Sequence, residues 1–452
     1  MESRRARNRR MKKIAVLLRI LFASSLLAIV LLASVLVKTA LYKQPEEPMA
    51  AGQEDDALGM AEAKEPLADE TQEAIEQAKE QAEETLDANE QSAEEAVLPE
   101  EQLLFEKAQE KLAEMSVEEK VAQLFFITPE ALTGVAKATA AGDTTKAQLE
   151  KYPVGGLIYF AQNFVDPAQT KEMLTKTQEY ALQSQGLPLF LGIDEEGGDV
   201  LRIGNNAAFQ VDTVGRMGDL AQGGETAVYE GAKTIAMYLS EYGLNVNFAP
   251  DADVLVNESN QVIGKRSFGN DPKVVKQMAA VYTRAMHEQG ILACYKHFPG
   301  HGGTTADSHT GAVTLDRTLE QLREEEFIPF ADASAQEAEF VMVSHIALPK
   351  VTGDTVPASV SANIVTGQLR GTLGYDGIVI TDALNMGAIS TQYDSGQAVI
   401  MAIKAGCDMV MMPKDFKTAY EALLNAVDAG EIDKQRIDES VIKILTAKIK
   451  MQ

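Results

Sequence analysis

The chain has 452 residues, a net charge of −26 and an apolar fraction of 45%. This length leaves room for one large domain or for two or three ordinary ones, and the strongly negative charge argues against nucleic acid as a partner. Cys294 and Cys407 are the two cysteines, and both stand in apolar runs. They are expected to be buried free thiols, because two cysteines are too few for a disulfide framework.

The N-terminal segment has the pattern of a membrane anchor. Residues 1–13 are basic, with five arginines among the first ten residues, and residues 14–40 are largely apolar. This apolar stretch is long enough for one transmembrane helix. We therefore expect a single-pass protein of the cell membrane, with its basic segment in the cytoplasm and the rest of the chain extracytoplasmic. Secretion after cleavage of a signal peptide is the alternative, although the apolar core of a signal peptide is normally shorter.

Residues 41–102 form an acidic segment. Between residues 45 and 102 stand twenty acidic residues and two lysines, so this stretch alone carries a net charge of −18. Its few aromatic and branched side chains cannot bury enough surface for independent folding, and no repeat of apolar heptads predicts a coiled coil. We expect a disordered linker between the bilayer and the domain that follows.

Residues 103–452 alternate between strand-like and helix-like stretches. A helix expected over residues 103–115 leads into Ser116 and Glu119, which have the spacing of a capping box. Eight short apolar runs follow, over residues 124–127, 156–160, 188–193, 246–249, 291–295, 340–343, 377–380 and 409–412. Stretches of helical composition separate most of them, over residues 170–185, 224–241, 272–289, 318–335, 362–373, 396–405 and 420–428.

This alternation predicts the fold class. Continuous apolar strands between amphipathic helices indicate a parallel sheet covered on both faces. Eight such units in about 350 residues predict an α/β fold, a single catalytic domain built as a (β/α)₈ TIM barrel. A doubly wound open sheet is the alternative, but it usually shows a glycine-rich phosphate turn after its first strand, and none is evident.

Polar or ionisable residues follow five of the eight apolar runs. These residues are Asp194 after the third run, Asp251 and Asp253 after the fourth, Lys296 and His297 after the fifth, Ser344 and His345 after the sixth, and Asp382 after the seventh. The carboxyl ends of the strands of a parallel barrel meet on one face, so residues nearly 200 positions apart become neighbours there. The sequence thus predicts an active site at that face.

Two elements of this set suggest catalysis by acids and bases. Asp382, at the end of a strand, is placed to attack an electrophilic centre, although an N-cap role for the next segment fits its spacing equally well. Asp307 and His309 stand two residues apart in a glycine-rich loop, where a carboxylate can fix the tautomer of an imidazole and raise its basicity. A surface turn without chemistry is the alternative for that pair.

Metal and nucleotide sites are not expected. His297 and His301 have the spacing of a helical zinc-binding pair, but Pro299 and Gly300 between them break a helix. The glycine pairs do not follow the dinucleotide or P-loop pattern, and no nucleophile elbow surrounds Ser344. We therefore predict no metal and no cofactor.

Several motifs together resemble glycoside hydrolase family 3, and within it the single-domain β-N-acetylglucosaminidases. Residues 194–202 resemble D-x-E-G-G-x-V-x-R, residues 247–254 resemble N-F-A-P-x-x-D-V, residues 263–269 resemble I-G-x-R-S-F-G, and residues 296–302 match K-H-F-P-G-H-G. Residues 307–309 match the D-x-H of the N-acetylglucosaminidase branch, and residues 357–359, 369–370 and 380–384 resemble the segments around the family nucleophile. The matches run in order from about residue 115 to about residue 440, and they are more specific together than singly.

The resemblance implies a role for each site residue. Asp382 is expected to be the nucleophile, His309 the general acid/base and Asp307 its partner. Five further residues are expected to hold the non-reducing-end sugar: Asp194, Arg202, Arg266, Lys296 and His297. The implied reaction is retaining exo-hydrolysis of β-linked N-acetylglucosamine from peptidoglycan fragments or related glycans, through a covalent glycosyl-enzyme. The expected partners are a carbohydrate substrate and the membrane, and the protein is expected to be a monomer.

The resemblance also leaves alternatives. Many family members take an acid/base glutamate from a second, sandwich domain, but this chain ends at Gln452 directly after the expected barrel, so the Asp307–His309 pair is expected to fill that role. Asp199 replaces the arginine that usually follows E-G-G. A phosphorylase using the same residues is the first alternative, and a catalytically inactive carbohydrate-binding module is the second. The natural glycan and the group attached to the sugar are not specified by these motifs.

Overall fold

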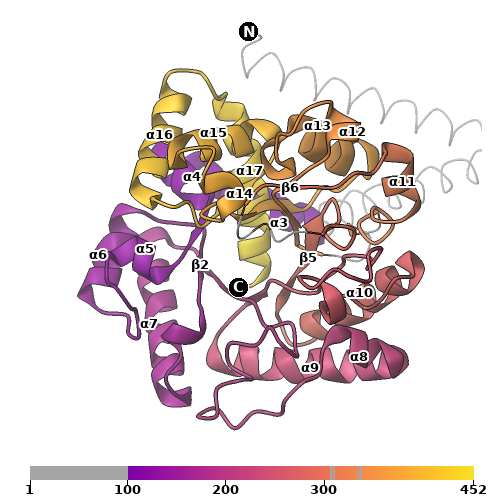
Figure 1. Ribbon diagram of the computed structural model, residues 1–452. Coiled ribbons are helices and arrows are strands. Elements are labelled where there is room, and N and C mark those ends of the chain that lie inside the picture. The colour runs from indigo at the N-terminus through magenta and orange to yellow at the C-terminus, as the bar shows by residue number, and fades with distance from the viewer. Residues whose placement is uncertain (1–99, 306–307, 309–310, 332, 335–337) are drawn as a thin grey trace, which may run out of the picture. The chain divides into compact units, whose positions relative to one another are not determined.

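Eight parallel strands close into a barrel at the centre of the domain (Figure 1). The computed structural model describes residues 100–305, 308, 311–331, 333–334 and 338–452. The barrel strands are β1 (Phe125–Ile127), β2 (Gly156–Ile158), β3 (Phe190–Ile193), β4 (Val246–Asn247), β5 (Leu292–Phe298), β7 (Phe340–Val343), β9 (Ile378–Ala383) and β10 (Met409–Met411). Because β1 pairs with both β2 and β10, the barrel is closed. The predicted TIM-like barrel is confirmed, and each predicted apolar run overlaps one strand.

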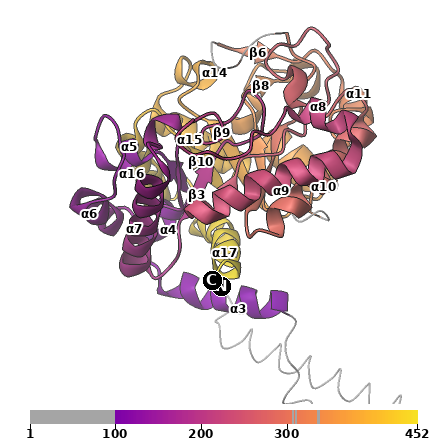
Figure 2. The same ribbon diagram turned by 90° about the horizontal axis from the view of Figure 1, so that it is seen from below.

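Helices cover the outside of the barrel (Figures 1 and 2). The longest are α3 (Glu100–Glu114), α7 (Pro167–Gln185), α9 (Gly224–Tyr242), α10 (Pro272–His287), α15 (Ser395–Ala405), α16 (Phe416–Asp428) and α17 (Lys434–Lys450). Shorter helices are α4 (Val117–Gln123), α5 (Pro129–Thr133), α6 (Asp143–Lys151), α8 (Met217–Gln222), α11 (Leu319–Glu324), α12 (Pro349–Thr352), α13 (Ala362–Ile364) and α14 (Gly387–Ser390). A π-helix, η4 (Val365–Thr372), continues α13, and three 3₁₀ turns are η1 (Ala161–Asn163), η2 (Gly264–Arg266) and η3 (Ala358–Val360).

Local sequence signals set many helix ends. Ser116 and Glu119 form the predicted capping box of α4. Asp166 caps α7 by accepting from the backbone N–H of Gln169, and Pro167 occupies the first helical position, where its missing N–H costs no hydrogen bond. Gly186 ends the same helix with a φ of 67°, a conformation that glycine adopts without strain.

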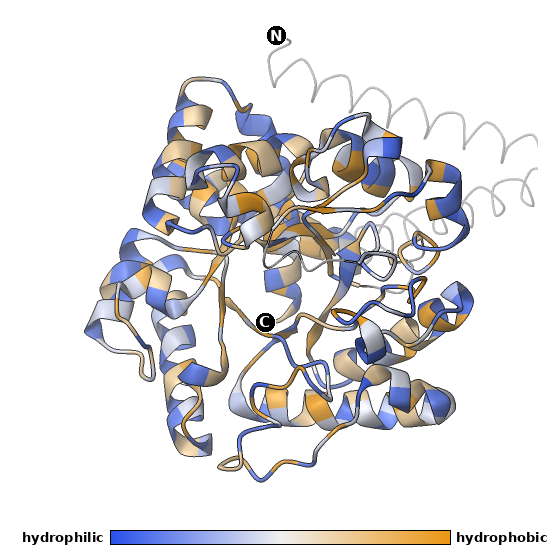
Figure 3. Ribbon diagram, in the orientation of Figure 1, coloured by the Kyte–Doolittle hydropathy of each residue, from blue (hydrophilic) through white to orange (hydrophobic). Residues whose placement is uncertain are grey.

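Phenylalanines fill the interior of the barrel. The rings of Phe126, Phe190, Phe248 and Phe340 contact one another across strands, with centroid distances from 5.1 to 6.4 Å. A Cβ at Gly156 or Gly192 would lie within 2.8 Å of the Phe126 ring, so these two glycines make room for it. Figure 3 shows the corresponding pattern, with hydrophobic residues on the central strands and hydrophilic residues on the outer turns of the helices.

A buried lysine from the C-terminal helix lies against this aromatic cluster. Lys448 of α17 is 0% exposed, its Nζ donates to Gln123 Oε1 at 2.8 Å, and it lies 5.3 Å from the centroid of the Phe190 ring. Burial lowers the pKa of this amine to about 7. A hydrogen bond to a neutral amide compensates little of the cost of burying a charge, so the neutral amine is the form that suits this site.

One helix prediction is wrong in part, and one long helix was not predicted. The helix expected over residues 318–335 is confirmed only as α11, which ends at Glu324, because Pro329 lacks the N–H that a longer helix needs. The sequence interpretation also missed α17, although its buried residues Ile437, Val441 and Ile444 follow helical spacing. A short parallel pair, β6 (Val313–Thr314) with β8 (Ile346–Ala347), was not expected either.

The predicted N-terminal elements lie outside the described residues. These are the basic segment 1–13, the transmembrane helix 14–40 and nearly all of the acidic linker 41–102. Among the helices that the structure describes from residue 100 onward, none combines the length and apolar character needed to cross a bilayer.

Substitution of Lys448 by methionine is expected to change the pH dependence of stability. Unfolded Lys448 keeps its proton up to its ordinary pKa of 10.5, whereas the folded protein releases it above about pH 7. The unfolded state therefore binds more protons between these values, and stability rises with pH in that window. We expect wild-type unfolding free energy, relative to Lys448→Met, to increase by about 1–2 kcal/mol from pH 7 to pH 9 in urea titrations. Parallel pH profiles for the two proteins would contradict this assignment.

Candidate active site

A cavity opens at the carboxyl ends of the barrel strands. Its volume is about 350 Å³. Six residues that the sequence singled out line it together: Asp194, Arg202, Arg266, Lys296, His297 and Asp382. The predicted convergence of strand ends is therefore confirmed for these six side chains, which come from β5, β9 and the loops after β3 and β4.

One side of the cavity is a wall of paired charges, which we call the charged wall: Asp194, Glu196, Arg202, Arg266 and Lys296. Lys296 Nζ lies 2.9 Å from Asp194 Oδ1 and 2.6 Å from Glu196 Oε1. Arg266 grips Glu196 with two bonds of 2.8 Å. Arg202 approaches Asp194 at 3.6 Å. A bidentate guanidinium–carboxylate pair has a fixed geometry, so this wall is rigid before any ligand arrives.

Mutual attraction keeps Glu196 and Lys296 ionised although both are buried. Burial alone would raise the pKa of Glu196, but the neighbouring Arg266 and Lys296 outweigh it and hold that pKa well below its usual range. Burial alone would lower the pKa of Lys296, but Asp194 and Glu196 raise it. These groups therefore stay charged near neutral pH and present strong donors and acceptors to a polar ligand.

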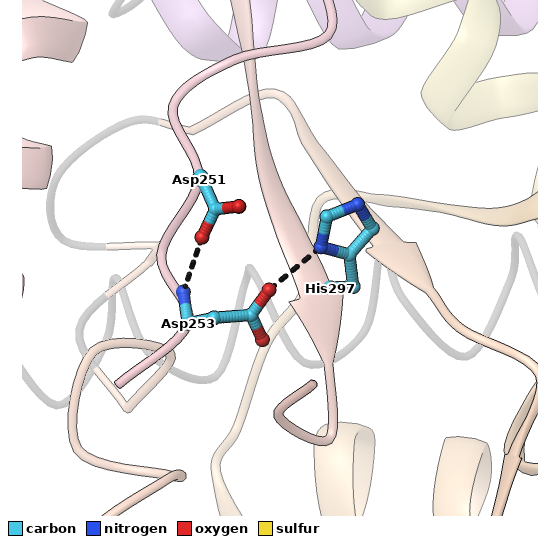
Figure 4. A group of neighbouring side chains, drawn as sticks. All are labelled: Asp251, Asp253 and His297. Carbon is cyan, nitrogen blue, oxygen red and sulfur yellow. Dashed lines mark hydrogen bonds and ion pairs between the residues drawn. The ribbon is translucent and has the colours of Figure 1, made fainter. Parts of the chain in front are cut away.

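His297 is held by the buried carboxylate of Asp253 (Figure 4). Its Nδ1 lies 2.7 Å from Asp253 Oδ2. The nearby His297 lowers the pKa of Asp253 against the opposing effect of burial. Since an ionised carboxylate can only accept, Nδ1 carries the proton, and the ring is oriented with Nε2 toward Arg266, 3.5 Å from its Nη2.

Asp251, Asp253 and His297 also offer three possible ligand atoms for a metal ion, all within 4.8 Å of one another. Asp253 already accepts from His297 and from the backbone N–H of His301, and Asp251 accepts from Asp253 N–H at 3.0 Å. Arg266 lies 3.7 Å from the remaining oxygen of Asp251. A cation would have to displace these bonds beside a guanidinium, so we assign no metal to the cluster.

The cavity lining also includes an acid and apolar side chains. Asp382, near the end of β9, is half-buried, and its Oδ1 accepts from the backbone N–H of Ala383 at 2.7 Å. Apolar residues of the lining include Ile158, Phe160, Val200, Met342, Met386, Met411 and Met412. A ligand with both polar and apolar groups suits this cavity.

Asp307 and His309, the predicted acid/base pair, lie outside the described residues. Ser308 between them is described and buried. Its Oγ lies 3.3 Å from His301 Nε2, and its carbonyl accepts from Ala388 N–H at 3.3 Å. Since Ala388 belongs to α14, shortly after Asp382, the chain at residue 308 passes close to the segment that carries this acid.

Sequence interpretation did not assign roles to four buried acids. Glu196 stands inside the recognised D-x-E-G-G segment, and Asp251 and Asp253 follow β4. The sequence therefore indicated where these acids lie, but it did not indicate which side chains they contact. Glu195 accepts from the backbone N–H of Arg202 and Gly204 and from the hydroxyl of Tyr238. It thereby fixes the loop that presents Arg202 to the cavity.

Comparison with known proteins identifies relatives of this chain. The profile described as "Glycosyl hydrolase family 3 N terminal domain" matches residues 116–447. Beta-hexosaminidase A of Pseudoalteromonas piscicida is 34% identical over 67% of this chain and 54% of its own length. Beta-hexosaminidase of Pseudomonas aeruginosa (strain LESB58) is 34% identical over 61% of this chain and 80% of its own length. The chain thus spans about half of the first relative and most of the second.

A solved structure supports the same grouping. The family 3 β-N-acetylglucosaminidase from Paenibacillus sp. str. FPU-7 superposes with a TM-score of 0.70 at 37% sequence identity. The superposition covers 75% of this chain and 63% of that one.

Removal of the charge on Glu196 is expected to destabilise the fold strongly. Glu196→Gln leaves Arg266 and Lys296 buried with one carboxylate fewer, and breaking a buried ion pair from one side costs about 3–5 kcal/mol. The matched control is Glu172→Gln, whose carboxylate pairs with Lys176 at 2.6 Å on the exposed face of α7, where solvent screens the pair and its loss is expected to change stability little. Equal changes in unfolding free energy for the two variants, measured by denaturant titration, would show that the charged wall does not stabilise the fold.

Proposed function

The chain belongs to glycosyl hydrolase family 3 and is by family a glycoside hydrolase, and from that premise we propose that it is a retaining exo-β-N-acetylglucosaminidase. Its reaction would remove a non-reducing-terminal N-acetylglucosamine through a covalent intermediate on Asp382. The observation that carries this proposal is the single cavity shared by Asp382 and the charged wall. Its volume of about 350 Å³ is at the lower end for ligand pockets, which suits one sugar ring better than a long chain.

The charged wall is proposed to bind the sugar hydroxyls. Vicinal hydroxyls both donate and accept, and the wall offers carboxylate oxygens beside ammonium and guanidinium donors. Because these groups are already paired and rigid, they orient a sugar without being ordered first. The apolar residues of the lining, among them Met386 and Met411, provide a surface for the methyl group of an acetamide. The names of the relatives support N-acetylhexosamine as the sugar.

Asp382 is proposed to form the covalent bond. Its Oδ1 accepts from Ala383 N–H, and one oxygen of this carboxylate would attack the anomeric carbon. As the bond to the leaving oxygen breaks, positive charge develops on the sugar ring, and a carboxylate in the cavity stabilises that charge. Attack on the anomeric carbon displaces the leaving oxygen with its electron pair, and water later displaces Asp382 from the same carbon, so the original configuration returns.

The acid/base role is proposed for His309, with Asp307 as its partner. The support is the D-x-H motif at residues 307–309 and the burial of Ser308 beside His301 and α14. In the first step His309 would give its proton to the leaving oxygen, and in the second step the same nitrogen would take a proton from water.

We also propose a location and a substrate source. Residues 14–40 would anchor the chain in the cell membrane and the acidic linker 41–102 would hold the catalytic domain outside it. Peptidoglycan fragments are the substrates that such a location favours. Both proposals rest on the sequence.

Asp382→Ala is expected to lower kcat on an aryl β-N-acetylglucosaminide by at least about 1,000-fold, because loss of a nucleophile removes the whole double-displacement route. Sodium azide should partly restore turnover by attacking the anomeric carbon in the space that the carboxylate left, and the product should be the α-glycosyl azide. An Asp382→Ala enzyme with wild-type turnover would disprove the assignment.

His309→Ala is expected to lower kcat/KM by a factor that depends on the leaving group of the substrate. General acid catalysis contributes about 100- to 10,000-fold when the leaving oxygen needs a proton, and much less for a dinitrophenolate. The measurement is kcat/KM across a series of aryl glycosides of graded leaving-group pKa, for which the variant should show a steeper dependence than the wild type.

The same assay separates the alternatives. For the proposed hydrolase, we expect the same rate of turnover with and without inorganic phosphate, and release of the free sugar. Formation of a sugar 1-phosphate would instead identify a phosphorylase, and the absence of turnover in the wild-type protein would identify a binding module.

A further inference from the structure

His345 extends the contact between two barrel strands beyond the point where their backbone ladder ends. The ladder between β7 and β9 pairs Phe340 with Ile378 and continues to Val343 with Thr381. In the same register residue 345 lies opposite residue 383. There the side chain of His345 replaces the backbone: its Nε2 lies 2.9 Å from the carbonyl oxygen of Ala383.

The hydrogen bonds of His345 define its tautomer. The carbonyl of Ala383 can only accept, so Nε2 carries a proton. Nδ1 lies 2.7 Å from Ser359 Oγ, and in the neutral ring it accepts the hydroxyl proton. Ser359 is held in turn by its own N–H, which donates to the carbonyl of Ser344 at 3.1 Å. His345 is 1% exposed and Ser359 is 0% exposed, so water does not compete for these bonds.

The peptide unit between Ala383 and Leu384 is thereby held from both neighbouring strands. Its carbonyl accepts from His345 on the β7 side, and its N–H, on Leu384, donates to the carbonyl of Met411 on the β10 side at 2.9 Å. The same carbonyl also accepts from the backbone N–H of Met386 at 3.0 Å. Of the two bonds to this carbonyl, the bond from His345 is the one that connects it to β7.

Ala383 connects this peptide unit to the proposed nucleophile. Its N–H, which belongs to the preceding peptide unit, donates to Asp382 Oδ1 at 2.7 Å, so the direction of that N–H influences the rotamer of the carboxylate. Rotation of the chain at Ala383 would turn the N–H away and shift the carboxylate within the cavity. A misplacement of about 1 Å at a reacting group can cost about 100-fold in rate.

We propose that His345 is a positioning residue for the glycosylation reaction, acting on Asp382 through Ala383, and that Ser359 fixes the His345 tautomer needed for this. The inference rests on the proposed role of Asp382. It assigns a role in the reaction to two residues outside the cavity, since neither His345 nor Ser359 belongs to the cavity lining.

The test compares four variants of the full-length chain on an aryl β-N-acetylglucosaminide. His345→Ala is expected to lower kcat by about 10- to 100-fold with KM within about 2-fold, because the sugar-binding wall is untouched while the nucleophile is misoriented. His345→Gln keeps an N–H donor at a similar distance from the backbone. Its decrease in log kcat relative to the wild type is expected to be at most about half of the decrease for His345→Ala. Ser359→Ala is expected to lower kcat by about 3- to 10-fold, since the histidine loses its orienting partner.

Ile444→Ala, in α17, is the matched control for loss of stability. It removes a fully buried side chain outside the cavity lining and should lower Tm without changing kcat below the melting range. The kcat values of His345→Ala and Ile444→Ala are compared under conditions in which the same fraction of each protein is folded. The inference is overturned if the two kcat values are equal, or if His345→Ala changes KM and leaves kcat at the wild-type value. If His345→Ala does not fold, the kcat values of His345→Gln and Ser359→Ala are compared with that of Ile444→Ala by the same criterion.

Asp382→Ala in the same assay keeps the two proposals apart. If Asp382→Ala is inactive and the His345 and Ser359 variants behave like Ile444→Ala, only the positioning role fails. If Asp382→Ala is fully active, the proposed function fails and the positioning role falls with it.

Discussion

Mutual neutralisation of buried charges is the constraint on which the cavity depends. Glu196 and Lys296 are each almost fully buried, and neither charge is stable there without the other. Arg266 completes the set by gripping Glu196 from the loop after β4. The charged side chains of such a site are already oriented before substrate binds, because opposite charges hold one another in place where little water is present.

The closed barrel gives that network its geometry. Asp194 follows β3 and Asp382 lies at the end of β9, 188 positions apart, yet both line one cavity because all strands run in the same direction. The aromatic interior below, filled by Phe126 and its neighbours, sets the spacing of the strands. Rigid strands and paired charges suit the proposed retaining mechanism, since the reacting carboxylate and the sugar must keep a fixed relation through two steps.

Sequence reasoning predicted what is local or periodic and missed what is made by tertiary contact. The eight strands and the Ser116 capping box were predictable because their signals lie within a few residues. The pairing of Glu196 with Arg266, 70 positions apart, was not, since no local pattern encodes it. Six of the eight predicted site residues line the cavity; the remaining two, Asp307 and His309, lie outside the described residues, so their placement stays a prediction.

The proposed chemistry depends on attack by Asp382 on the anomeric carbon. Denaturing quench during turnover of a 2,4-dinitrophenyl β-N-acetylglucosaminide, followed by proteolysis and mass spectrometry, tests this step directly. We expect a peptide that carries one N-acetylhexosamine on Asp382 and loses it on further incubation before quenching. Turnover that leaves the peptide unlabelled and gives the α-anomer as first product, or a label on another side chain, would contradict it.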